Sequence, residues 1–310
     1  MQEFEFIRHI HRHCAELPAN GFEGIGDDCA VLELGDEALV FTADALMEGV
    51  HFLRHATSPR ELGHKALAVN LSDVAAMGVR PVAVMLSISL PRDLEEGWAE
   101  AFIEGFTALA KQHQVALIGG DTTRSEQGIA LSVTAIGRGP RTSLKRRREA
   151  HVGDTLLVTA PLGASAAGLR ELLQGHLNHP LAAQHRTPQP EIEVGMWLGL
   201  RPEVHAMMDL SDGLASDICH IAEESHVGFD LDLATIPVAE GATREDAICG
   251  GEDYKLLLTA DSNAVAQLCR DFEARFARPL YPIGHITSHE MRWHEKGVAV
   301  ATPTPYFHHF

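Results

Sequence analysis

The sequence predicts an α/β protein of two domains. Its 310 residues are long for a single hydrophobic core and sufficient for two. Short apolar runs typical of strands alternate with stretches that show helical spacing, a pattern typical of α/β folds. Around 138–153 the composition changes to Arg, Gly and Pro without a periodic pattern. We therefore predict one domain over 1–140 and a second over 150–310.

In the first half, strands and helices are predicted in alternation. Leu62, Ala66 and Val69 recur at helical spacing before Gly78 ends the helix. The predicted strands cover 38–43, 82–90, 115–118 and 129–136, and the predicted helices cover 61–77 and about 95–112.

The second half repeats this alternation. Predicted strands cover 155–160, a short run before Asp209, 229–233 and 254–259; predicted helices cover 164–174, 191–199, 213–224 and 262–276; a polar segment reaches 190 and a terminal set covers 281–300. Both halves bring carboxylates to the ends of strand-like runs. In open α/β sheets, ligands bind outside the carboxyl ends of strands, so we expect a site at the junction of the two halves.

Composition excludes several classes of partner. A hydrophobic content of 45% and a charged content of 22% are typical of a soluble globular protein. The formal net charge of −18 argues against nucleic acid, because phosphate backbones require a basic surface. The sequence contains neither an apolar run long enough to span a membrane nor a secretory leader, so we expect a cytoplasmic protein. Five scattered cysteines without CxxC spacing suit a reducing compartment.

Carboxylates recur in six segments next to apolar runs. The segments are Gly26-Asp27-Asp28, Thr42-Ala43-Asp44, Asn70-Leu71-Ser72-Asp73, Gly119-Gly120-Asp121, Asp209-Leu210-Ser211-Asp212-Gly213 and Gly250-Gly251-Glu252-Asp253. Each alone also fits a helix cap or a turn. Gathered together, carboxylates repel one another unless a cation neutralises them. Oxygen ligands without a Cys/His set favour Mg²⁺, which usually acts through substrate phosphates.

The absence of known motifs narrows the chemistry. The sequence has no GxxxxGK[ST] loop, no protein-kinase motif set and no GxSxG elbow, so covalent catalysis is not indicated. If the protein binds nucleotide phosphates, it does so with a fold unrelated to those that carry these motifs. The basic run Lys145-Arg146-Arg147-Arg148 fits either a solvated turn or a clamp for a small polyphosphate. Because the chain has only five Lys, such a ligand would be neutralised by metal ions and a few Arg.

Six segments taken in order resemble thiamine-monophosphate kinase. They are GIGDDCA at 24–30, TADALMEGVHF at 42–52, KALAVNLSDVAAMG at 65–78, LIGGDTTR at 117–124, DLSDGLASD at 209–217 and GGEDY at 250–254. The resemblance runs from about residue 24 to the C-terminus. It places the chain in the superfamily of ATP-dependent synthetases that includes aminoimidazole ribonucleotide synthetase and selenophosphate synthetase.

The resemblance implies phosphorylation of thiamine monophosphate by ATP as co-substrate, which gives thiamine diphosphate and ADP. It also implies a synthetase-like α/β fold of the α+β type. In that fold, the N-terminal α/β domain forms a β-barrel across a homodimer, and ATP lies between it and the C-terminal α/β domain. No general base is assigned, because the acceptor is itself a phosphate anion.

The resemblance also implies roles for individual residues. Ligands of several Mg²⁺ ions would be Asp28, Asp44, Asp73, Asp121, Asp209 and Asp212, with a further oxygen from Thr42. Gly120, Asp121, Arg147 and Ser211 would contact the nucleotide, and His51, Glu252 and Phe307 would contact the thiamine phosphate. Arg146 and Arg148 are alternatives to Arg147, and Ala43 stands where relatives often carry Thr.

Three other functions stay open. A sister ATP-dependent synthetase would activate a different acceptor. A catalytically silent metal-binding or nucleotide-sensing dimer would bind without turnover. A phosphohydrolase built on similar carboxylates would release phosphate from thiamine monophosphate without consuming ATP.

Overall fold

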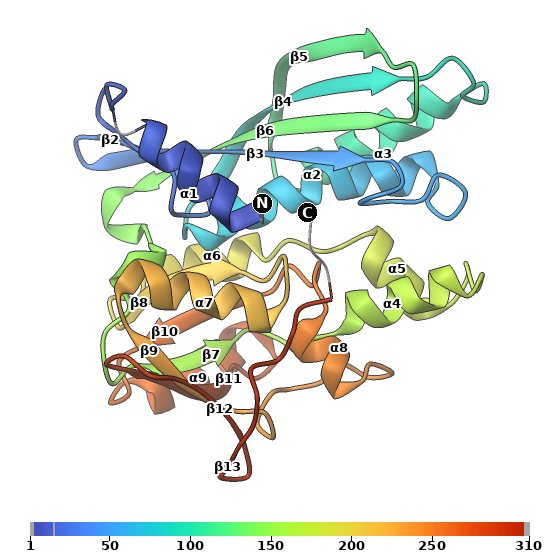
Figure 1. Ribbon diagram of the computed structural model, residues 1–310. Helices are drawn as coiled ribbons and strands as arrows, with labels where there is room; N and C mark the ends of the chain where they lie inside the picture. Colours follow the sequence, from blue (N-terminus) through green and yellow to red (C-terminus); the bar gives the residue numbers. More distant parts are fainter. Residues whose placement is uncertain (1–2, 15, 307–310) are drawn as a thin grey trace.

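The computed structural model describes residues 3–14 and 16–306. Two sheets, each with its own helices, make up the two halves of the chain. Figure 1 shows the blue and green strands of the first half above the yellow to red elements of the second. The predicted α/β class is thereby confirmed.

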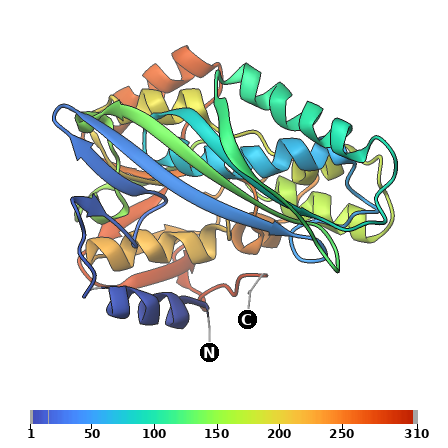
Figure 2. The ribbon, with the colours of Figure 1, turned by 90° about the horizontal axis from the view of Figure 1, so that it is seen from above.

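The first sheet has six strands in the order β1-β2-β3-β6-β4-β5. Their bounds are β1 Phe22–Glu23, β2 Ala30–Leu34, β3 Glu37–Met47, β4 Arg80–Leu90, β5 Ala116–Arg124 and β6 Ala130–Pro140. Only β4 and β5 pair in parallel, and α3 (Trp98–Gln112) makes the crossover between them. Figure 2 shows α2 (Pro59–Ala76) and α3 lying along the long crossing strands. An N-terminal helix, α1, covers Glu3–Cys14.

Helix α2 lies between the two halves of the molecule. Ser58 and Glu61 form a capping box at its start, and Pro59 occupies the first turn, where no amide partner is needed. Gly63 packs against the backbone of Phe102 in α3 so closely that a Cβ would not fit. A helix buried on every side is usually apolar throughout, yet α2 also buries Lys65, Asn70 and Ser72. These polar groups are explained by the site described below.

The second sheet has seven strands in the order β13-β12-β9-β11-β7-β10-β8. The strands are β7 Thr155–Val158, β8 Val204–Asp209, β9 Gly228–Asp232, β10 Leu256–Ala260, β11 Tyr281–Thr287, β12 Met291–Glu295 and β13 Val298–Ala299. The helices are α4 Ala164–Leu173, α5 Pro180–Arg186, α6 Ile192–Gly199, α7 Leu214–Ser225, α8 Arg244–Cys249 and α9 Val265–Phe276, with the short 3₁₀ turns η1 Arg141–Ser143 and η2 Arg147–Glu149.

Most predicted elements are confirmed, but two predictions were wrong. The polar segment through 190 contains the helix α5, and Asp44 and Asp121 lie within β3 and β5 instead of beyond their ends. Both sheets are mainly antiparallel, so their strands do not all end at one edge as those of an open parallel sheet do. An apolar run underestimates the length of a strand when a polar residue interrupts it, as Asp44 does in β3 and Asp121 does in β5. Helices α1 and α8 and strands β1 and β2 were not predicted.

No helix in the described ranges 3–14 and 16–306 combines the length and apolarity needed to cross a membrane.

Candidate active site

Three carboxylates meet where the two halves touch. Asp28 precedes β2, Asp73 lies on α2 and Asp209 ends β8, and each offers an oxygen within 4.8 Å of the others. Thr42 Oγ1 donates to Asp73 Oδ2 at 2.5 Å. Ser72 Oγ donates to Asp209 Oδ2, also at 2.5 Å. The contact between α2 and β8 therefore gathers acids from both halves into one cluster.

Burial raises the pKa values of these acids and so disfavours their ionised forms. Loss of solvent, together with the charge of Asp44, raises the pKa of Asp73 well above its usual range. Burial and the charge of Asp28 do the same to the pKa of Asp209. The pKa of Asp44 rises to about 6, first through burial and then through Asp28 and Asp212. A cation held among these groups would stabilise their ionised forms and so offset both effects.

Arg147 is the only cation of the run 145–148 that contacts this cluster among the described residues. Its Nη2 donates to Asp28 Oδ1 at 2.5 Å. Burial opposes the charge of the guanidinium, but the neighbouring Asp28 carboxylate outweighs it, so the pKa of Arg147 is raised. Arg146 and Arg148 instead pair with Glu23, at 2.9 and 2.8 Å. The geometry thus places Arg147, and neither neighbour, beside the acids.

The loop after β8 presents Ser211 and Asp212 to the same region. Asp217 on α7 is 1% exposed, and its Oδ2 accepts hydrogen bonds from the backbone amides of Asp212 at 3.2 Å and Gly213 at 3.0 Å. Gly213 has φ +107, a conformation that L side chains rarely adopt. Asp217 and Gly213 therefore fix the direction of this loop.

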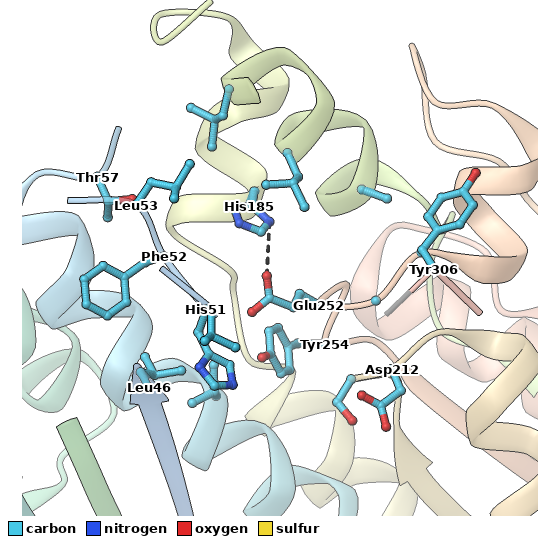
Figure 3. A pocket seen from close by; sticks show the side chains of 18 of the residues that line it. Leu46, His51, Phe52, Leu53, Thr57, His185, Asp212, Glu252, Tyr254 and Tyr306 are labelled. Carbon is cyan, nitrogen blue, oxygen red and sulfur yellow. Dashed lines mark ion pairs between the residues drawn. The ribbon is translucent and has the colours of Figure 1, made fainter. Parts of the chain in front are cut away.

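A cavity of about 790 Å³ extends from the acids toward α4 and α5. Its polar lining includes Asp44, His51, Asp73, Ser211, Asp212 and Glu252, and its apolar lining includes Leu46, Val50, Phe52, Leu53, Leu169, Leu172, Tyr254 and Tyr306. Figure 3 shows Phe52 and Leu53 on the N-terminal side, with Asp212 and Tyr306 on the C-terminal side. One end of the cavity is therefore acidic and the other largely apolar.

Glu252 is a negative charge beside the apolar part of the cavity. Lys65 Nζ of α2, with a side chain 1% exposed, lies 2.9 Å from Glu252 Oε2 and also donates to the His51 carbonyl at 3.1 Å. Burial opposes the ionised form, but the charge of Lys65 outweighs it and lowers the pKa of Glu252. His185 Nδ1 lies 3.1 Å from Glu252 Oε2 (Figure 3). Burial and then Lys65 lower the pKa of His185 to about 4, so its ring is neutral at pH 7.

Two predicted residues lie apart from the cluster, and a third falls outside the described part of the chain. Gly120 and Asp121 are exposed on β5. Asp44 is paired with Val133, Val133 with Leu86, and Leu86 with Gly120 on four adjacent strands. Gly120 therefore lies three strand spacings, or about 14 Å, from Asp44. Gly120 also has no room for a Cβ against the Leu86 carbonyl, which explains this glycine by packing. Phe307 lies outside the described residues.

The sequence-based prediction missed Lys65, His185 and Asp217. A Lys at the start of the otherwise apolar run 65–69 is a signal for a buried ion pair, because an unpaired Lys is almost never buried. Asp217 closes the segment DLSDGLASD at 209–217, so its spacing marks it as part of the loop. His185 has no such signal, because only the position of α5 brings it to the cavity.

Comparisons with known proteins agree with this geometry. The AIR synthase related protein family matches with its N-terminal domain over residues 26–139 and its C-terminal domain over 151–293. The thiamine-monophosphate kinase of Buchnera aphidicola is 35% identical, covering 93% of this chain and 92% of the relative. The crystal structure of thiamine-monophosphate kinase from Stenotrophomonas maltophilia is 39% identical, with a TM-score of 0.78 over 96% of this chain and 98% of that chain.

A second solved structure, AaThiL complexed with AMPPCP and TMP, is 30% identical, with a TM-score of 0.85. It covers 100% of this chain and 97% of that chain. These likenesses extend over nearly the whole length and confirm the resemblance drawn from the six segments. The chain belongs to the thiamine-monophosphate kinase family of enzymes, within the AIR synthase related proteins.

Proposed function

We propose that this protein transfers the γ-phosphoryl group of ATP to thiamine monophosphate, giving thiamine diphosphate and ADP. The observation that carries the proposal is the cavity that joins an acidic cluster to an apolar pocket containing Glu252. A relative of the same fold carries AMPPCP, an ATP analogue, and TMP together. The two ends of the cavity suit the two substrates.

The acidic end suits Mg²⁺. Its donors are all oxygens, and among the described residues Asp28 Oδ2 is a buried oxygen without a hydrogen-bond partner. Such a set fits a hard cation better than zinc or copper. Asp28, Asp73 and Asp209 would hold Mg²⁺ ions, with Asp44, Asp212 and Thr42 as further ligands. Bound there, Mg²⁺ would neutralise charge on the phosphate oxygens.

The chain's own residues then position the phosphates. Phosphoryl transfer depends mainly on alignment and on positive charge near the transferred group. Arg147, held by Asp28, supplies a fixed positive charge at the nucleotide end. Ser211 supplies a hydroxyl on the loop that Asp217 orients. The acceptor phosphate attacks in line as an anion, so no general base is required.

The apolar end suits thiamine. The thiazolium ring of thiamine carries a permanent positive charge, and Glu252 offers a carboxylate that Lys65 keeps ionised. Leu53, Phe52 and Tyr306 give apolar walls for the two rings. His51 faces the same cavity, near the border with the acids. Phe307, which the resemblance assigns to contact with the thiamine phosphate, follows Tyr306 directly in the sequence.

The exposed strand β5 supports a homodimer. All nine of its residues are exposed, with Leu117 at 43% and Ile118 at 58%, although edge strands are usually short, charged or covered. A second copy packed there would extend the sheet toward a barrel and bring Gly120 and Asp121 next to a nucleotide. In this proposal, 1–140 supplies the dimer contact and part of the metal site, and 150–310 completes the site.

The proposal is tested by incubating the purified protein with ATP, Mg²⁺ and thiamine monophosphate and separating the products by chromatography. We expect thiamine diphosphate and ADP in equal amounts. ADP without thiamine diphosphate would redirect the acceptor to that of a sister synthetase. Phosphate released from thiamine monophosphate without ATP consumption would indicate a phosphohydrolase, and binding without turnover would indicate a sensing protein.

A further inference from the structure

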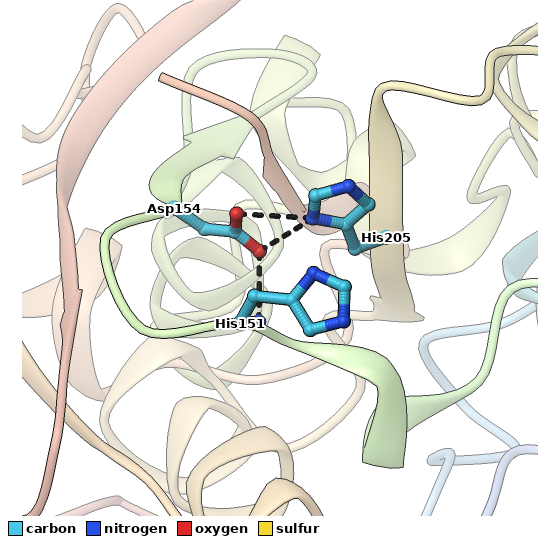
Figure 4. Close-up of side chains that lie close together, drawn as sticks. All are labelled: His151, Asp154 and His205. Atoms are coloured by element: carbon cyan, nitrogen blue, oxygen red, sulfur yellow. Dashed lines mark hydrogen bonds and ion pairs between the residues drawn. The ribbon is translucent and has the colours of Figure 1, made fainter. Parts of the chain in front are cut away.

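A second cluster of metal-binding side chains lies outside the cavity. It consists of His151, Asp154 and His205, whose ligand atoms all lie within 4.8 Å of one another. His205 Nδ1 is 3.0 and 2.9 Å from the two carboxylate oxygens of Asp154. The rings of His151 and His205 are 4.3 Å apart between centroids. Figure 4 shows both rings on the same side of the carboxylate.

The scaffold holds Asp154 firmly. Asp154 is 4% exposed and directly precedes β7. Its Oδ2 accepts a hydrogen bond from the His151 backbone amide at 2.9 Å, and its own carbonyl accepts one from Ile286 of β11 at 2.9 Å. His205 is the second residue of β8. The sheet therefore fixes the side chains of Asp154 and His205, whereas His151 is exposed.

We propose that His151, Asp154 and His205 bind one Zn²⁺ ion. Zinc takes imidazole nitrogens and carboxylate oxygens at about 2.0–2.2 Å, so tetrahedral ligands lie about 3.3–3.5 Å apart. The pair formed by Asp154 and His205 is slightly closer than this, and the whole set spans at most 4.8 Å. A small opening of the pair and a rotation of the His151 side chain would complete the set.

The chemistry of this cluster separates it from the acidic cluster. Two imidazoles and one carboxylate prefer Zn²⁺ to Mg²⁺, which takes oxygen ligands. Binding through Nδ1 of His205 requires that nitrogen to carry no proton, with the ring proton on Nε2. Asp261, whose pKa is lowered chiefly by hydrogen bonds from Asn263, adds negative charge to the surroundings. Water would complete the coordination of the ion.

The position of the cluster predicts a structural role. His205 and Asp209 lie on the same strand, β8, four residues and about 13 Å apart. An ion at His205 would link the start of β7 to the start of β8, which are separated in the sheet by β10. It would stabilise the C-terminal half without touching a substrate. The proposal is therefore independent of the reaction proposed above.

The test measures Zn²⁺ binding to the full-length protein by equilibrium dialysis in excess Mg²⁺, added to compete with Zn²⁺ for the oxygen ligands of the acidic cluster. The variants are His151→Ala and His205→Gln. The matched control is the double variant His9→Ala/His13→Ala, because His9 Nε2 and His13 Nε2 lie 3.1 Å apart and form another histidine pair. Co²⁺ absorption in the visible range reports the ligand geometry, and thermal unfolding reports the stabilisation.

We expect one tightly bound Zn²⁺ in the natural sequence and in the control, at least tenfold weaker binding in His151→Ala and loss of binding in His205→Gln. His151→Ala keeps the backbone hydrogen bond to Asp154, so it tests the site even if His205→Gln does not fold. Unchanged binding in His151→Ala would overturn the proposal. So would failure of the natural sequence to bind, or loss of binding in the control.

Discussion

Ser72 on α2 donates its hydroxyl to Asp209 at the end of β8, across 137 residues of sequence and a distance of 2.5 Å. Ser72 is 0% exposed and Asp209 is 1% exposed, so water does not compete for the bond. The same helix binds the Asp44 backbone amide through Asn70 and Glu252 through Lys65. One buried helix thus positions acids from both halves of the chain.

Replacing Ser72 with Ala should weaken metal binding. Asp209 would lose a donor that lowers its pKa, so the carboxylate would become harder to ionise. A buried acceptor left without a partner costs about 1–3 kcal/mol of folding free energy. Calorimetry would measure the Mg²⁺ affinity, and urea unfolding the stability. Ser143→Ala is the control, because the buried Ser143 hydroxyl has no hydrogen-bond partner. Equal behaviour of the two variants would contradict the role of Ser72.

Replacing Lys65 with Met should act on the thiamine end of the cavity. Without the Lys65 charge, the pKa of Glu252 rises and the pocket loses its negative charge near neutral pH. We expect the KM for thiamine monophosphate to rise more than tenfold while the KM for ATP changes little. Steady-state kinetics with each substrate varied would show the difference. If Lys65→Met and Glu252→Gln are additive in a double-mutant cycle, the two residues do not act as a pair.

Asp212→Asn should leave the fold intact and remove most Mg²⁺-dependent turnover. The amide keeps the shape of the side chain but loses its charge, and hence most of its affinity for Mg²⁺. A nucleotide analogue with Mg²⁺ should raise the melting temperature of the natural sequence more than that of the variant. Asp36→Asn, at an exposed position, is the matched control. Full activity in Asp212→Asn would remove this residue from the metal site.

The stabilisation by Mg²⁺ should grow as the pH rises from 5 to 8. The pKa values of Asp44 and Asp27 are raised to about 6 and about 7, so the folded state holds protons that the unfolded state has released. Without metal, stability is therefore lost as the pH rises through these values. Mg²⁺ binds the ionised carboxylates and offsets that loss. Melting curves with Mg²⁺ and with EDTA would measure the difference, and an increment independent of pH would contradict this account.

Ile118→Lys should convert a dimer into monomers. Ile118 is 58% exposed on β5, and a charge buried without a partner at a dimer contact is costly. Sedimentation velocity would give the mass of the particle. Leu200→Lys is the control, because Leu200 is 69% exposed at the end of α6, away from β5. A dimer that persists in Ile118→Lys would place the contact elsewhere.

Sequence and structure agree best where a local pattern is sufficient. Helix α2 was predicted at 61–77 from the spacing of Leu62, Ala66 and Val69, and it covers Pro59–Ala76. Helix α5 was missed because its seven residues are too few to show a clear helical periodicity. Strand β3 was predicted too short because Asp44 interrupts the apolar run, although the strand continues through Met47.

The sequence by itself determined the α/β class, the acid-rich segments and the resemblance to a kinase family, because residue spacing and motif order are local properties of the chain. Only the tertiary structure decided which of these residues meet. It joined Asp28, Asp73 and Asp209, placed Arg147 of the basic run beside them, and left Gly120 about 14 Å from Asp44. The physical reason is that such contacts depend on how α2 packs between the two sheets, and side chains far apart in the sequence set that packing.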